Sequence, residues 1–419
     1  MIRDIVVIGG GASGLAASIS AKKRNKDVLL IEREESLGGI LNQCIHNGFG
    51  LEVFKEEYTG PEYAHKFIEE FMDLKIDYLV NTTVIKLDKN NDDFIITLSS
   101  KELGIRNITA RSVIISSGCY ERTRGQISMP GDRPNGVITA GSAQRYLNIN
   151  GYMVGKKVFI LGSGDIGLIM ARRMYLEGAE VLGVAEIMPY SNGLNRNIVQ
   201  CLNDFDIPLY LSHTVTNVEA DEDKRLSAIT IQQVDERFNP IPNTEKHFEV
   251  DTLLLSIGLI PDITLLDDLY VEVDPKTKSA KINQAYETSV KGLFICGNSL
   301  QVHDLVDNVS KESSRAGLSA SDYLDGLVTN RKKIAINPGK NILYVAPQYL
   351  DFGWVEKDLL VSYRSSKKIE KALVKVYQGE KLIYQKRRAF IVPAEMETLT
   401  FSYLELDQNQ DIMIEIEEV

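Results

Sequence analysis

The sequence predicts an α/β fold, because one strand–turn–helix pattern occurs in it twice and its last part consists of short alternating runs. The first copy opens the chain, where an apolar strand leads into a glycine turn at residues 9–14 and then into a helix. The second copy begins at residue 157 with the same order of elements. Past residue 341, apolar and polar residues alternate as they do in β-strands. We therefore expect two Rossmann-like, three-layer domains and a small all-β domain at the C-terminus.

The first glycine turn has the spacing of a dinucleotide-binding site. Gly9 allows a sharp turn, Gly11 lets the backbone approach a pyrophosphate, and Gly14 lets the helix pack closely on the strand. The following apolar run, residues 28–31, ends in Glu32, where a carboxylate can accept hydrogen bonds from a ribose. A glycine-rich turn of an unrelated α/β protein is the alternative. Because strand, helix and distal acid are all in place, we predict a bound dinucleotide.

The second copy repeats this spacing with Gly162, Gly164 and Gly167, and its second strand ends in Glu186. An acid at this position favours a ribose diol over a 2′-phosphate, and the next arginine, Arg196, is ten residues away. The second site is therefore predicted to bind NAD rather than NADP.

The remaining stretches before the tail predict ordinary elements. Residues 61–74 have the pattern of an amphipathic helix, and residues 76–108 that of an antiparallel meander. Residues 112–118 form a buried strand that ends in glycine. The stretch 33–50 has too many glycines for a helix and is too polar for a buried strand, so we expect a functional loop.

The composition is that of a soluble, two- to three-domain protein: 419 residues, 44% hydrophobic and 25% charged. The net charge of −11 gives no reason to expect nucleic acid as a partner. No apolar run is long enough to span a bilayer, and no signal peptide is evident at the N-terminus. Four widely spaced cysteines without a C-x-x-C pair fit a cytoplasmic location and predict no metal site.

The tail is expected to start with a linker at residues 332–340. Six or seven short strands follow within residues 341–419, with a hairpin turn at residues 378–381. This pattern predicts a β-sandwich-like domain at residues 335–419. Such a domain could dock a partner or a second copy, or it could simply cover the preceding core.

These motifs together resemble the two-dinucleotide-binding flavoproteins, the glutathione-reductase-like pyridine nucleotide-disulfide oxidoreductase superfamily, over about residues 1–328. The resemblance rests on five stretches: residues 9–14 with Glu32, 116–118, 162–167 with Glu186, 255–262, and 292–298. It implies FAD in the first site and a nicotinamide nucleotide in the second. It also implies a discontinuous FAD domain, residues 1–150 and 285–330, around an NAD domain at residues 151–284.

The resemblance and the two turns together give the residues expected to bind the cofactors FAD and NAD. In the family the last motif usually ends in Gly-Asp, whereas this chain has Asn298, an amide that can still donate and accept. Asp165 stands where several relatives have a gating aromatic residue. The expected cofactor-binding residues are Gly9, Gly11, Ala12, Ser13, Gly14, Glu32, Arg33, Gly39, Ile40, Leu41, Gly118, Arg122, Gly162, Gly164, Asp165, Ile166, Gly167, Glu186, Gly258, Gly297, Asn298, Asp304 and Leu305.

The chain departs from the disulfide reductases of this superfamily. Their redox cysteines would fall at Leu41 and His46, and the glutamate of their second motif is Ile169 here. No histidine follows His303, so the tail lacks their acid–base pair. Thiol–disulfide exchange needs an attacking thiolate and a resolving thiol, which this loop does not supply.

Three residues are candidates for catalysis near the flavin: Cys44, His46 and His303. Cys44 could cycle through a sulfenic acid, as in NADH peroxidases, or pack as a small buried residue. His46 could tune the flavin or cap a loop carbonyl. His303 could add to the field of a helix N-terminus or be a solvated loop residue. Arg122 could bind a phosphate or carboxylate, or belong to a solvated basic turn.

Residues 39–49, 118–125 and 298–306 are similar to FAD/NAD subunits associated with glycerol-3-phosphate dehydrogenase-like proteins and, more distantly, to subunits of opine oxidase, dye-linked proline dehydrogenase and hydrogen cyanide synthase. This resemblance implies a hetero-oligomer with a partner flavoprotein dehydrogenase subunit. We predict an FAD-dependent NAD(P)H oxidoreductase in which a hydride passes between NADH and FAD and electrons are exchanged with that partner or a small acceptor, without a dithiol. The alternatives are an NADH oxidase or peroxidase using Cys44, and a non-catalytic assembly subunit that retains FAD.

Overall fold

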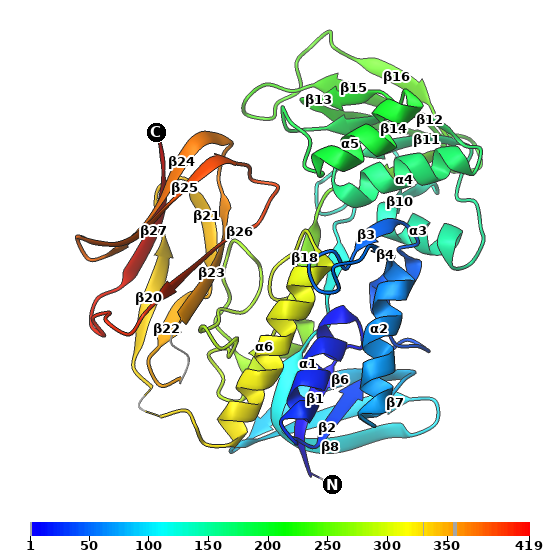
Figure 1. Ribbon diagram of the computed structural model, residues 1–419. Coiled ribbons are helices and arrows are strands. Elements are labelled where there is room, and N and C mark those ends of the chain that lie inside the picture. Colours follow the sequence, from blue (N-terminus) through cyan, green and yellow to red (C-terminus); the bar gives the residue numbers. More distant parts are fainter. Residues whose placement is uncertain (1, 330, 355–357) are drawn as a thin grey trace. The chain divides into compact units, whose positions relative to one another are not determined.

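The computed structural model describes residues 2–329, 331–354 and 358–419. The chain separates into two compact units, Met1–Cys119 with Pro261–Val419, and Tyr120–Ile260 (Figure 1). The sequence placed these boundaries later, near residues 150 and 284. Residues 120–150 belong to the second unit because their strand and helix pack on its sheet.

The first unit is built on a seven-stranded sheet. Its order is β5-β2-β1-β8-β7-β6, and β19 also pairs with β8. The strands β1, β2, β5, β8 and β19 are parallel where they pair, whereas β6, β7 and β8 form the antiparallel meander predicted at residues 76–108. Their bounds are β1 Ile2–Ile8, β2 Val28–Ile31, β5 Asp77–Leu79, β6 Thr82–Asn90, β7 Asp93–Ser100, β8 Gly104–Ile115 and β19 Leu293–Ile295.

Three helices pack around this sheet: α1 (Ala12–Lys23), α2 (Gly60–Asp73) and α6 (Val306–Leu324). The helices α1 and α6 lie side by side (Figure 1), and a Cβ at Gly317 would come within 2.2 Å of the Ala17 carbonyl oxygen. The predicted helix at residues 61–74 is confirmed as α2, which a capping box of Thr59 and Glu62 starts.

The long loop at residues 33–50 is less irregular than the sequence suggested. It contains the 3₁₀ turn η1 (Gly39–Gln43) and the short strand β3 (Asn47–Phe49), which pairs with β4 (Tyr58–Thr59). Two further 3₁₀ turns of this unit are η3 (Thr264–Leu269) and η4 (Gly297–Ser299). Turns this short leave no periodic pattern in the sequence, which is why pattern analysis missed them.

The second unit has a five-stranded parallel sheet of order β10-β17-β11-β12-β13 and a three-stranded antiparallel sheet, β14-β15-β16. The helices α3 and α4 pack on the parallel sheet, and the short α5 packs on α4. The strands β9 and β18 pair with each other at the two points where the chain passes from one unit to the other. The bounds are β9 Cys119–Glu121, β10 Val137–Thr139, α3 Ala140–Asn148, β11 Lys157–Leu161, α4 Asp165–Leu176, β12 Glu180–Glu186, α5 Asn195–Cys201, η2 Asn203–Phe205, β13 Leu209–Leu211, β14 His213–Ala220, β15 Leu226–Gln233, β16 Lys246–Glu249, β17 Thr252–Leu255 and β18 Leu259–Pro261.

The C-terminal region, part of the first unit, is a strand-rich domain of two sheets. One has the order β22-β20-β27-β24-β25 and the other β21-β23-β26. The described residues of this region form eight strands, where the sequence predicted six or seven. The bounds are β20 Lys333–Pro338, β21 Ile342–Ala346, β22 Tyr349–Asp351, β23 Asp358–Ser365, β24 Ile369–Gln378, β25 Lys381–Ile391, β26 Glu397–Ser402 and β27 Ile412–Glu418.

The linker expected at residues 332–340 is wrong, because this stretch is mostly β20, an inner strand of the larger sheet. Ile334 and Ile336 are buried in the core of the C-terminal domain, which gives the stretch the alternation of a half-buried strand. The hairpin turn predicted at residues 378–381 is confirmed between β24 and β25.

The C-terminal domain is bonded directly to the segment that precedes β19. The Ile282 amide donates to Gln348 Oε1 (3.0 Å), and Gln284 Nε2 donates to the Asp351 carbonyl oxygen (2.7 Å). Tyr349 donates its hydroxyl to Glu272 (2.6 Å). The domain therefore covers part of the core of its own unit. A role in docking a partner stays a prediction.

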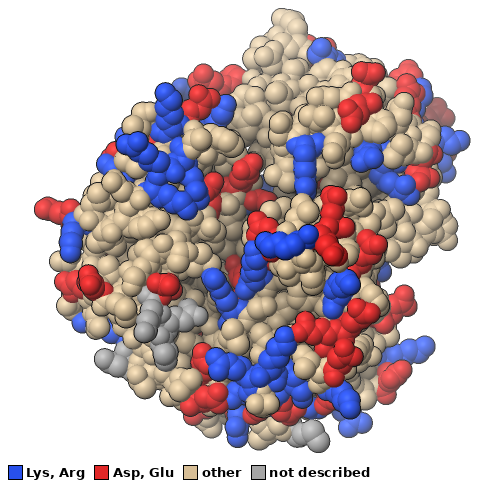
Figure 2. Space-filling model, in the orientation of Figure 1, with Lys and Arg blue, Asp and Glu red and all other residues tan. Residues whose placement is uncertain are grey.

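Acidic and basic side chains are interspersed on the face shown in Figure 2, without a broad field of one sign. Within the described residues, no helix combines the length and apolar character needed to cross a membrane.

Candidate cofactor-binding sites

The first site lies at the carboxyl edge of the large parallel sheet. Four neighbouring strands end in register there, with Ile8 opposite both Ile31 and Ile115, and Ile115 opposite Ile295. The residues that come next are therefore brought to one edge: Glu32, Gly9, Ser116 and Cys296. Ligands of open α/β sheets bind outside the carboxyl ends of such strands.

The glycines of the first turn divide into crowded and open positions. A Cβ at Gly9, where φ is +108°, would lie 2.3 Å from the Ser116 carbonyl oxygen, and one at Gly14 would lie 1.8 Å from that of Gly9. At Gly11, the nearest atom to a Cβ is Gly39 Cα, 3.9 Å away. Gly9 and Gly14 thus serve the packing of the turn, whereas Gly11 leaves open space where α1 begins. No side chain of the described residues caps this N-terminus, so its N–H groups at Ala12 and Ser13 suit a pyrophosphate.

Glu32 is held in place by the backbone around it. Its carboxylate is 6% exposed and accepts hydrogen bonds from the Gly10 amide (2.6 Å) and the Glu34 amide (2.8 Å), one on each oxygen. A carboxylate has about four acceptor positions, so two remain for hydroxyl donors such as those of a ribose.

The loop after β2 closes on the glycine turn. Gly39, with φ of +56°, approaches Gly11 so closely that a Cβ on it would lie 2.9 Å from Gly11 Cα. Leu41 is buried, whereas the neighbouring Ile40 is 60% exposed. An apolar side chain left exposed beside an open turn suits the flat apolar body of a ligand.

Cys44 and His46 both engage their own loop. The Cys44 thiol donates to the Ile40 carbonyl oxygen (3.3 Å), and burial raises the pKa of this thiol to about 12. His46 Nδ1 is 2.9 Å from the Asn47 carbonyl oxygen, and its ring lies 5.0 Å from that of Phe49. These contacts tie both side chains to the backbone of their loop, and Cys44 is partly exposed rather than fully buried. The roles of both residues beside a flavin stay predictions.

A second group of site residues surrounds the start of α6. Glu312, on this helix, accepts hydrogen bonds from the Gly297 amide (2.7 Å) and from Gln301 Nε2 (2.9 Å). Asn298 Oδ1 accepts from the His303 amide (3.1 Å). One buried carboxylate and one amide therefore fix the backbone of the Gly-Asn turn.

The imidazole of His303 is buried behind this turn. Its Nε2 lies 3.1 Å from Glu312 Oε1, but without hydrogen-bond alignment, and the side chain is only 3% exposed. Neither ring nitrogen has a hydrogen-bond partner among the described residues. Because both ring nitrogens are shielded from solvent, the structure places His303 as a buried neighbour of the turn.

Two aspartates beside the N-terminus of α6 hold other segments. Asp304 binds the C-terminal domain through Arg364 (2.6 Å) and the Met396 amide (2.7 Å). Asp307 accepts hydrogen bonds from the amides of Gly50 (3.1 Å) and Val53 (2.8 Å). Leu305 is the N-cap residue of the helix, and α6 has no side-chain cap among the described residues.

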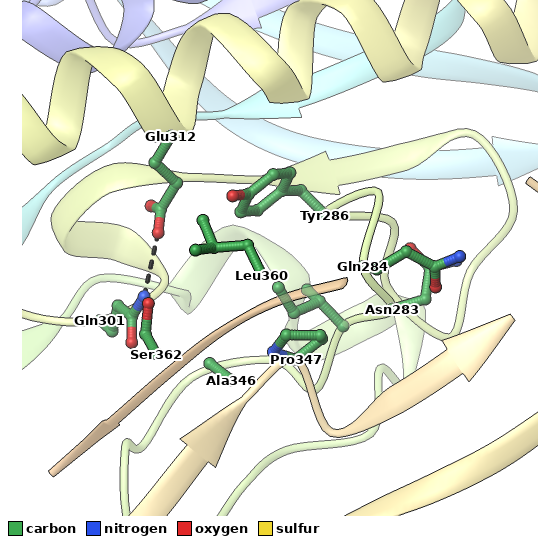
Figure 3. Close-up of a pocket in the computed structure, with 10 residues that line it drawn as sticks. Asn283, Gln284, Tyr286, Gln301, Glu312, Ala346, Pro347, Leu360 and Ser362 are labelled. Carbon is green, nitrogen blue, oxygen red and sulfur yellow. Dashed lines mark hydrogen bonds between the residues drawn. The ribbon is translucent and has the colours of Figure 1, made fainter. Parts of the chain in front are cut away.

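A small cavity lies between α6 and the C-terminal domain (Figure 3). Gln301 and Glu312 line it together with Ser362 and Pro347 of the C-terminal domain. It has room for about one water molecule, so it cannot be the cofactor site.

The second site repeats the geometry of the first within its own unit. Leu161 pairs with both Ala185 and Leu255, so Gly162, Glu186 and Ser256 follow at one edge. A Cβ at Gly162, where φ is +96°, would lie 2.1 Å from the Ser256 carbonyl oxygen, and one at Gly167 would lie 2.7 Å from that of Gly162. At Gly164, the closest atom is Ser256 Oγ at 3.3 Å.

Glu186 resembles Glu32 in its surroundings. It is 3% exposed, and its oxygens accept from the Ser163 amide (2.9 Å), the Ser163 hydroxyl (2.7 Å) and the Met188 amide (3.0 Å). The sequence analysis missed Ser163. A hydroxyl residue between the first two glycines, in reach of the distal acid, was the available signal.

Asp165 is used inside its own unit. Its carboxylate accepts from the Leu194 amide (2.8 Å) and Asn197 Nδ2 (2.7 Å), which holds the loop after β12 near α4. The Asn192 amide also donates to Ser163 Oγ (3.1 Å). Asp165, which the sequence analysis includes among the cofactor-binding residues, is thus an anchor for this loop in the structure.

Three of the other predicted residues, Gly118, Arg122 and Gly258, lie near the points where the chain passes from one unit to the other. The Gly118 carbonyl oxygen accepts from the Asp262 amide (3.0 Å) in the first unit, and the Arg122 amide donates to the Gly258 carbonyl oxygen (3.0 Å) in the second. Arg33 lies after Glu32 and is 3.9 Å from Glu34, a loose and solvent-exposed ion pair. None of these contacts assigns a ligand to Arg33 or Arg122.

A family model described as pyridine nucleotide-disulphide oxidoreductase matches residues 3–313. The chain belongs to this family. Both glycine turns, both glutamates and the start of α6 lie inside the matched residues.

Relatives of this family member include subunits of larger enzymes. Sarcosine oxidase subunit alpha of a Corynebacterium species is 25% identical over 273 residues, which cover 62% of this chain and 27% of the relative. Hydrogen cyanide synthase subunit HcnB of Pseudomonas protegens is 24% identical over 285 residues, covering 64% of this chain and 59% of the relative. The chain thus spans less than two thirds of the length of either relative.

Among solved structures, thioredoxin reductase from T. acidophilum is similar, with a TM-score of 0.62 and 22% identity over 78% of this chain and 99% of that one. This likeness concerns the fold. It confirms the α/β architecture with two dinucleotide-binding domains, to which this chain adds its strand-rich C-terminal region.

Proposed function

We propose that this protein is an FAD-dependent NAD(P)H oxidoreductase that passes electrons to a partner subunit or a small acceptor. The observation that carries the proposal is the pair of matching sites, each with a glycine turn at the start of a helix and a buried glutamate whose oxygens bind the backbone of its own site. Such turns select the pyrophosphate and ribose that dinucleotide cofactors have in common.

The residues of the first site fit FAD. The open space at Gly11 and the uncapped start of α1 suit a pyrophosphate, and Glu32 has free acceptor positions for a ribose. The exposed Ile40 would be covered by an apolar ring. FAD, when bound, supplies a group that accepts a hydride and releases electrons singly or in pairs.

The chain's own part in the reaction is binding and electrostatics. The uncapped N–H groups at the start of α6 favour negative charge near them, because the N-terminus of a helix carries partial positive charge. The bonds of Asn298 and Glu312 hold this segment in one arrangement. A fixed set of donors stabilises developing charge without having to reorganise.

The second site is proposed for NADH. Glu186 would place a negative charge beside the adenosine ribose, where NADPH carries its 2′-phosphate. We expect kcat/KM for NADH to exceed that for NADPH by about tenfold or more. Glu186→Gln should reduce this preference, and Glu180→Gln, an exposed acid at the other end of β12, is the control.

A dithiol or thiol mechanism has little support in this chain. Leu41 and His46 stand at the positions of the reductases' cysteines, and the thiol of Cys44 has its pKa raised to about 12. A thiol that stays protonated is a poor nucleophile.

The partner is proposed from the relatives. Two similar proteins are named as subunits, of sarcosine oxidase and of hydrogen cyanide synthase. We infer that this chain also works in a hetero-oligomer and that a second flavoprotein dehydrogenase exchanges electrons with it. A non-catalytic assembly subunit with FAD is the alternative, and the titration below separates the two.

The experiment is an anaerobic titration of the purified, FAD-loaded protein with NADH, followed by absorbance at the flavin bands. We expect about one equivalent of NADH to bleach the flavin, since each hydride carries two electrons. Gly164→Val, which fills the second turn, should keep its FAD and lose this bleaching. A protein that binds FAD but is not bleached by NADH or NADPH would instead be the assembly subunit. Failure to bind FAD would refute the proposal altogether.

A further inference from the structure

Arg364, on β23 of the C-terminal domain, reaches into the segment that leads into α6. Its guanidinium donates to the Val302 carbonyl oxygen (3.0 Å) and to Asp304 Oδ1 (2.6 Å). It also donates to the carbonyl oxygens of Pro393 (3.2 Å) and Ala394, in the loop before β26. One side chain thus joins residues 302–304 to two parts of the C-terminal domain.

The ion pair is sheltered and uses both oxygens of the carboxylate. The side chains of Arg364 and Asp304 are 13% and 21% exposed, and Asp304 Oδ2 accepts from the Met396 amide (2.7 Å). Burial opposes the charge on Arg364, but the attraction of Asp304 and the contact with Tyr344 outweigh it and raise the pKa of Arg364. Partly buried ion pairs with several hydrogen bonds hold geometry better than exposed ones.

The segment held in this way is connected to the Gly297–Asn298 turn. The His303 amide, one residue before Asp304, donates to Asn298 Oδ1 (3.1 Å). The next residue, Leu305, is the N-cap of α6. A shift of residues 302–305 would therefore move both the amide of Asn298 and the first N–H groups of the helix.

We propose that Arg364 is a positioning residue for the flavin site: the C-terminal domain fixes the segment 302–305, and through it the turn and helix start that face the cofactor. This inference rests on the proposed function, because the cofactor is FAD. It assigns the C-terminal domain a part in the redox site in addition to covering its core.

The test compares Arg364→Gln with Arg388→Gln. Arg388 also forms an ion pair, with Glu397 at 2.8 Å, but the two partners lie within the C-terminal domain. Apoprotein of each variant and of the wild type is titrated with FAD to obtain Kd. The absorption spectrum and midpoint potential of the bound flavin and the melting temperature of the apoprotein are measured as well.

We expect Arg364→Gln to weaken FAD binding by about ten- to a hundredfold, the range seen when outer partners of a preorganised site are removed. Its flavin spectrum and potential should shift, whereas Arg388→Gln should match the wild type in all three. Equal Kd, spectrum and potential in both variants would overturn the inference and leave the proposed function standing. A wild-type protein that takes up no FAD would overturn both.

A second variant covers the case in which Arg364→Gln does not fold. Asp304→Asn removes the ion pair but leaves Arg364 its carbonyl partners at Val302, Pro393 and Ala394. It should therefore keep the domain docked and still weaken FAD binding. An Asp304→Asn protein with wild-type Kd, spectrum and potential would also overturn the inference.

Discussion

Single residues decide whether the first turn can hold a cofactor, and they do so in two different ways. Gly9 is required by the backbone, because its φ is +108° and a Cβ there would strike the Ser116 carbonyl oxygen. Gly11 has φ of −78° and open space around it, so the fold itself would accept a side chain. The residue type is the same at both positions, and in the sequence only the spacing of the motif assigns them different roles.

Gly11→Ala should therefore fold normally and bind FAD poorly. The added methyl group occupies the space that a pyrophosphate needs, and Ala is compatible with the observed φ. We expect a melting temperature of the apoprotein close to that of the wild type, with FAD binding weakened on the order of a hundredfold. Gly9→Ala should lower the melting temperature itself, and Gly125→Ala, at an exposed turn with nothing crowding it, should change neither. Tight FAD binding by Gly11→Ala would contradict the assignment of this turn.

Cys44 provides a second test at this scale. Since burial raises the pKa of its thiol to about 12, the thiolate is scarce at neutral pH. We expect Cys44→Ser to keep NADH turnover within about twofold of the wild type. Alkylation of Cys44, followed by mass spectrometry, should be slow and should accelerate about tenfold per pH unit between pH 7 and 9, because the thiolate reacts. A loss of turnover in Cys44→Ser, together with fast alkylation at pH 7, would favour the peroxidase alternative.

At the scale of elements, patterns with a regular period were predicted well and irregular ones were not. The strand–turn–helix units, α2 and the meander β6–β8 follow from period 3.6 or 2 and are confirmed. The lysines, proline and glycine in residues 332–340 suggested a linker, yet Ile334 and Ile336 point into a core and make this stretch β20. The stretch is a strand because it pairs with β22 on one side and with β27, far along the chain, on the other. Such tertiary pairing overrides the local preference of these residues.

The strand β27 offers a matched test of the C-terminal sheet. Ile414 is fully buried, on a strand that lies between β20 and β24. The preceding residue, Met413, points to the other face of the sheet and is 41% exposed. Ile414→Ala should lower the free energy of unfolding by about 2–4 kcal/mol, from lost burial and the cavity left behind. Met413→Ala should cost less than about 1 kcal/mol.

Urea unfolding followed by the fluorescence of Trp354, the only tryptophan, measures both variants. This side chain is 6% exposed and its ring lies 6.1 Å from that of Phe294, so it reports on the C-terminal domain where that domain meets β19. Equal costs for the two variants would show that β27 does not have the register described.

At the scale of the whole molecule, the sequence located both sites but not what supports them. Glycines and acids have fixed spacing along the chain, so Gly9, Glu32, Gly162 and Glu186 could be found. Asp304 with Arg364 and Glu312 with Gly297 are pairs formed only by folding, and a single sequence contains no signal for them. The burial of the His303 ring and the bonds of Asp165 to Leu194 and Asn197 also arise only on folding, so a single sequence could not show them.

One such unpredicted cluster joins the start of the C-terminal domain to the segment before β19. Arg331 forms an ion pair with Glu287 and lies 3.8 Å from Asp351, and both carboxylates are fully buried. Its guanidinium also lies 5.9 Å from the ring of Trp354. Burial raises the pKa of Asp351, partly offset by the Gly353 amide and by Arg331. The arginine therefore compensates charge that would otherwise be costly to bury.

Arg331→Met should accordingly destabilise the protein by about 3–5 kcal/mol at pH 8, because it leaves buried carboxylates without their cation. Without Arg331, the pKa of Asp351 in the folded state rises further above its unfolded value near 4. Between those two values the folded state binds more protons than the unfolded state, so stability is lost as the pH rises through this window. The deficit relative to the wild type should therefore be smaller at pH 5 than at pH 8. Melting curves at both pH values measure it, with Arg111→Met, which removes an exposed ion pair of 3.6 Å with Asp4, as the control expected to cost less than about 1 kcal/mol. A deficit independent of pH would show that Arg331 contributes through its packing on Trp354 rather than through its charge.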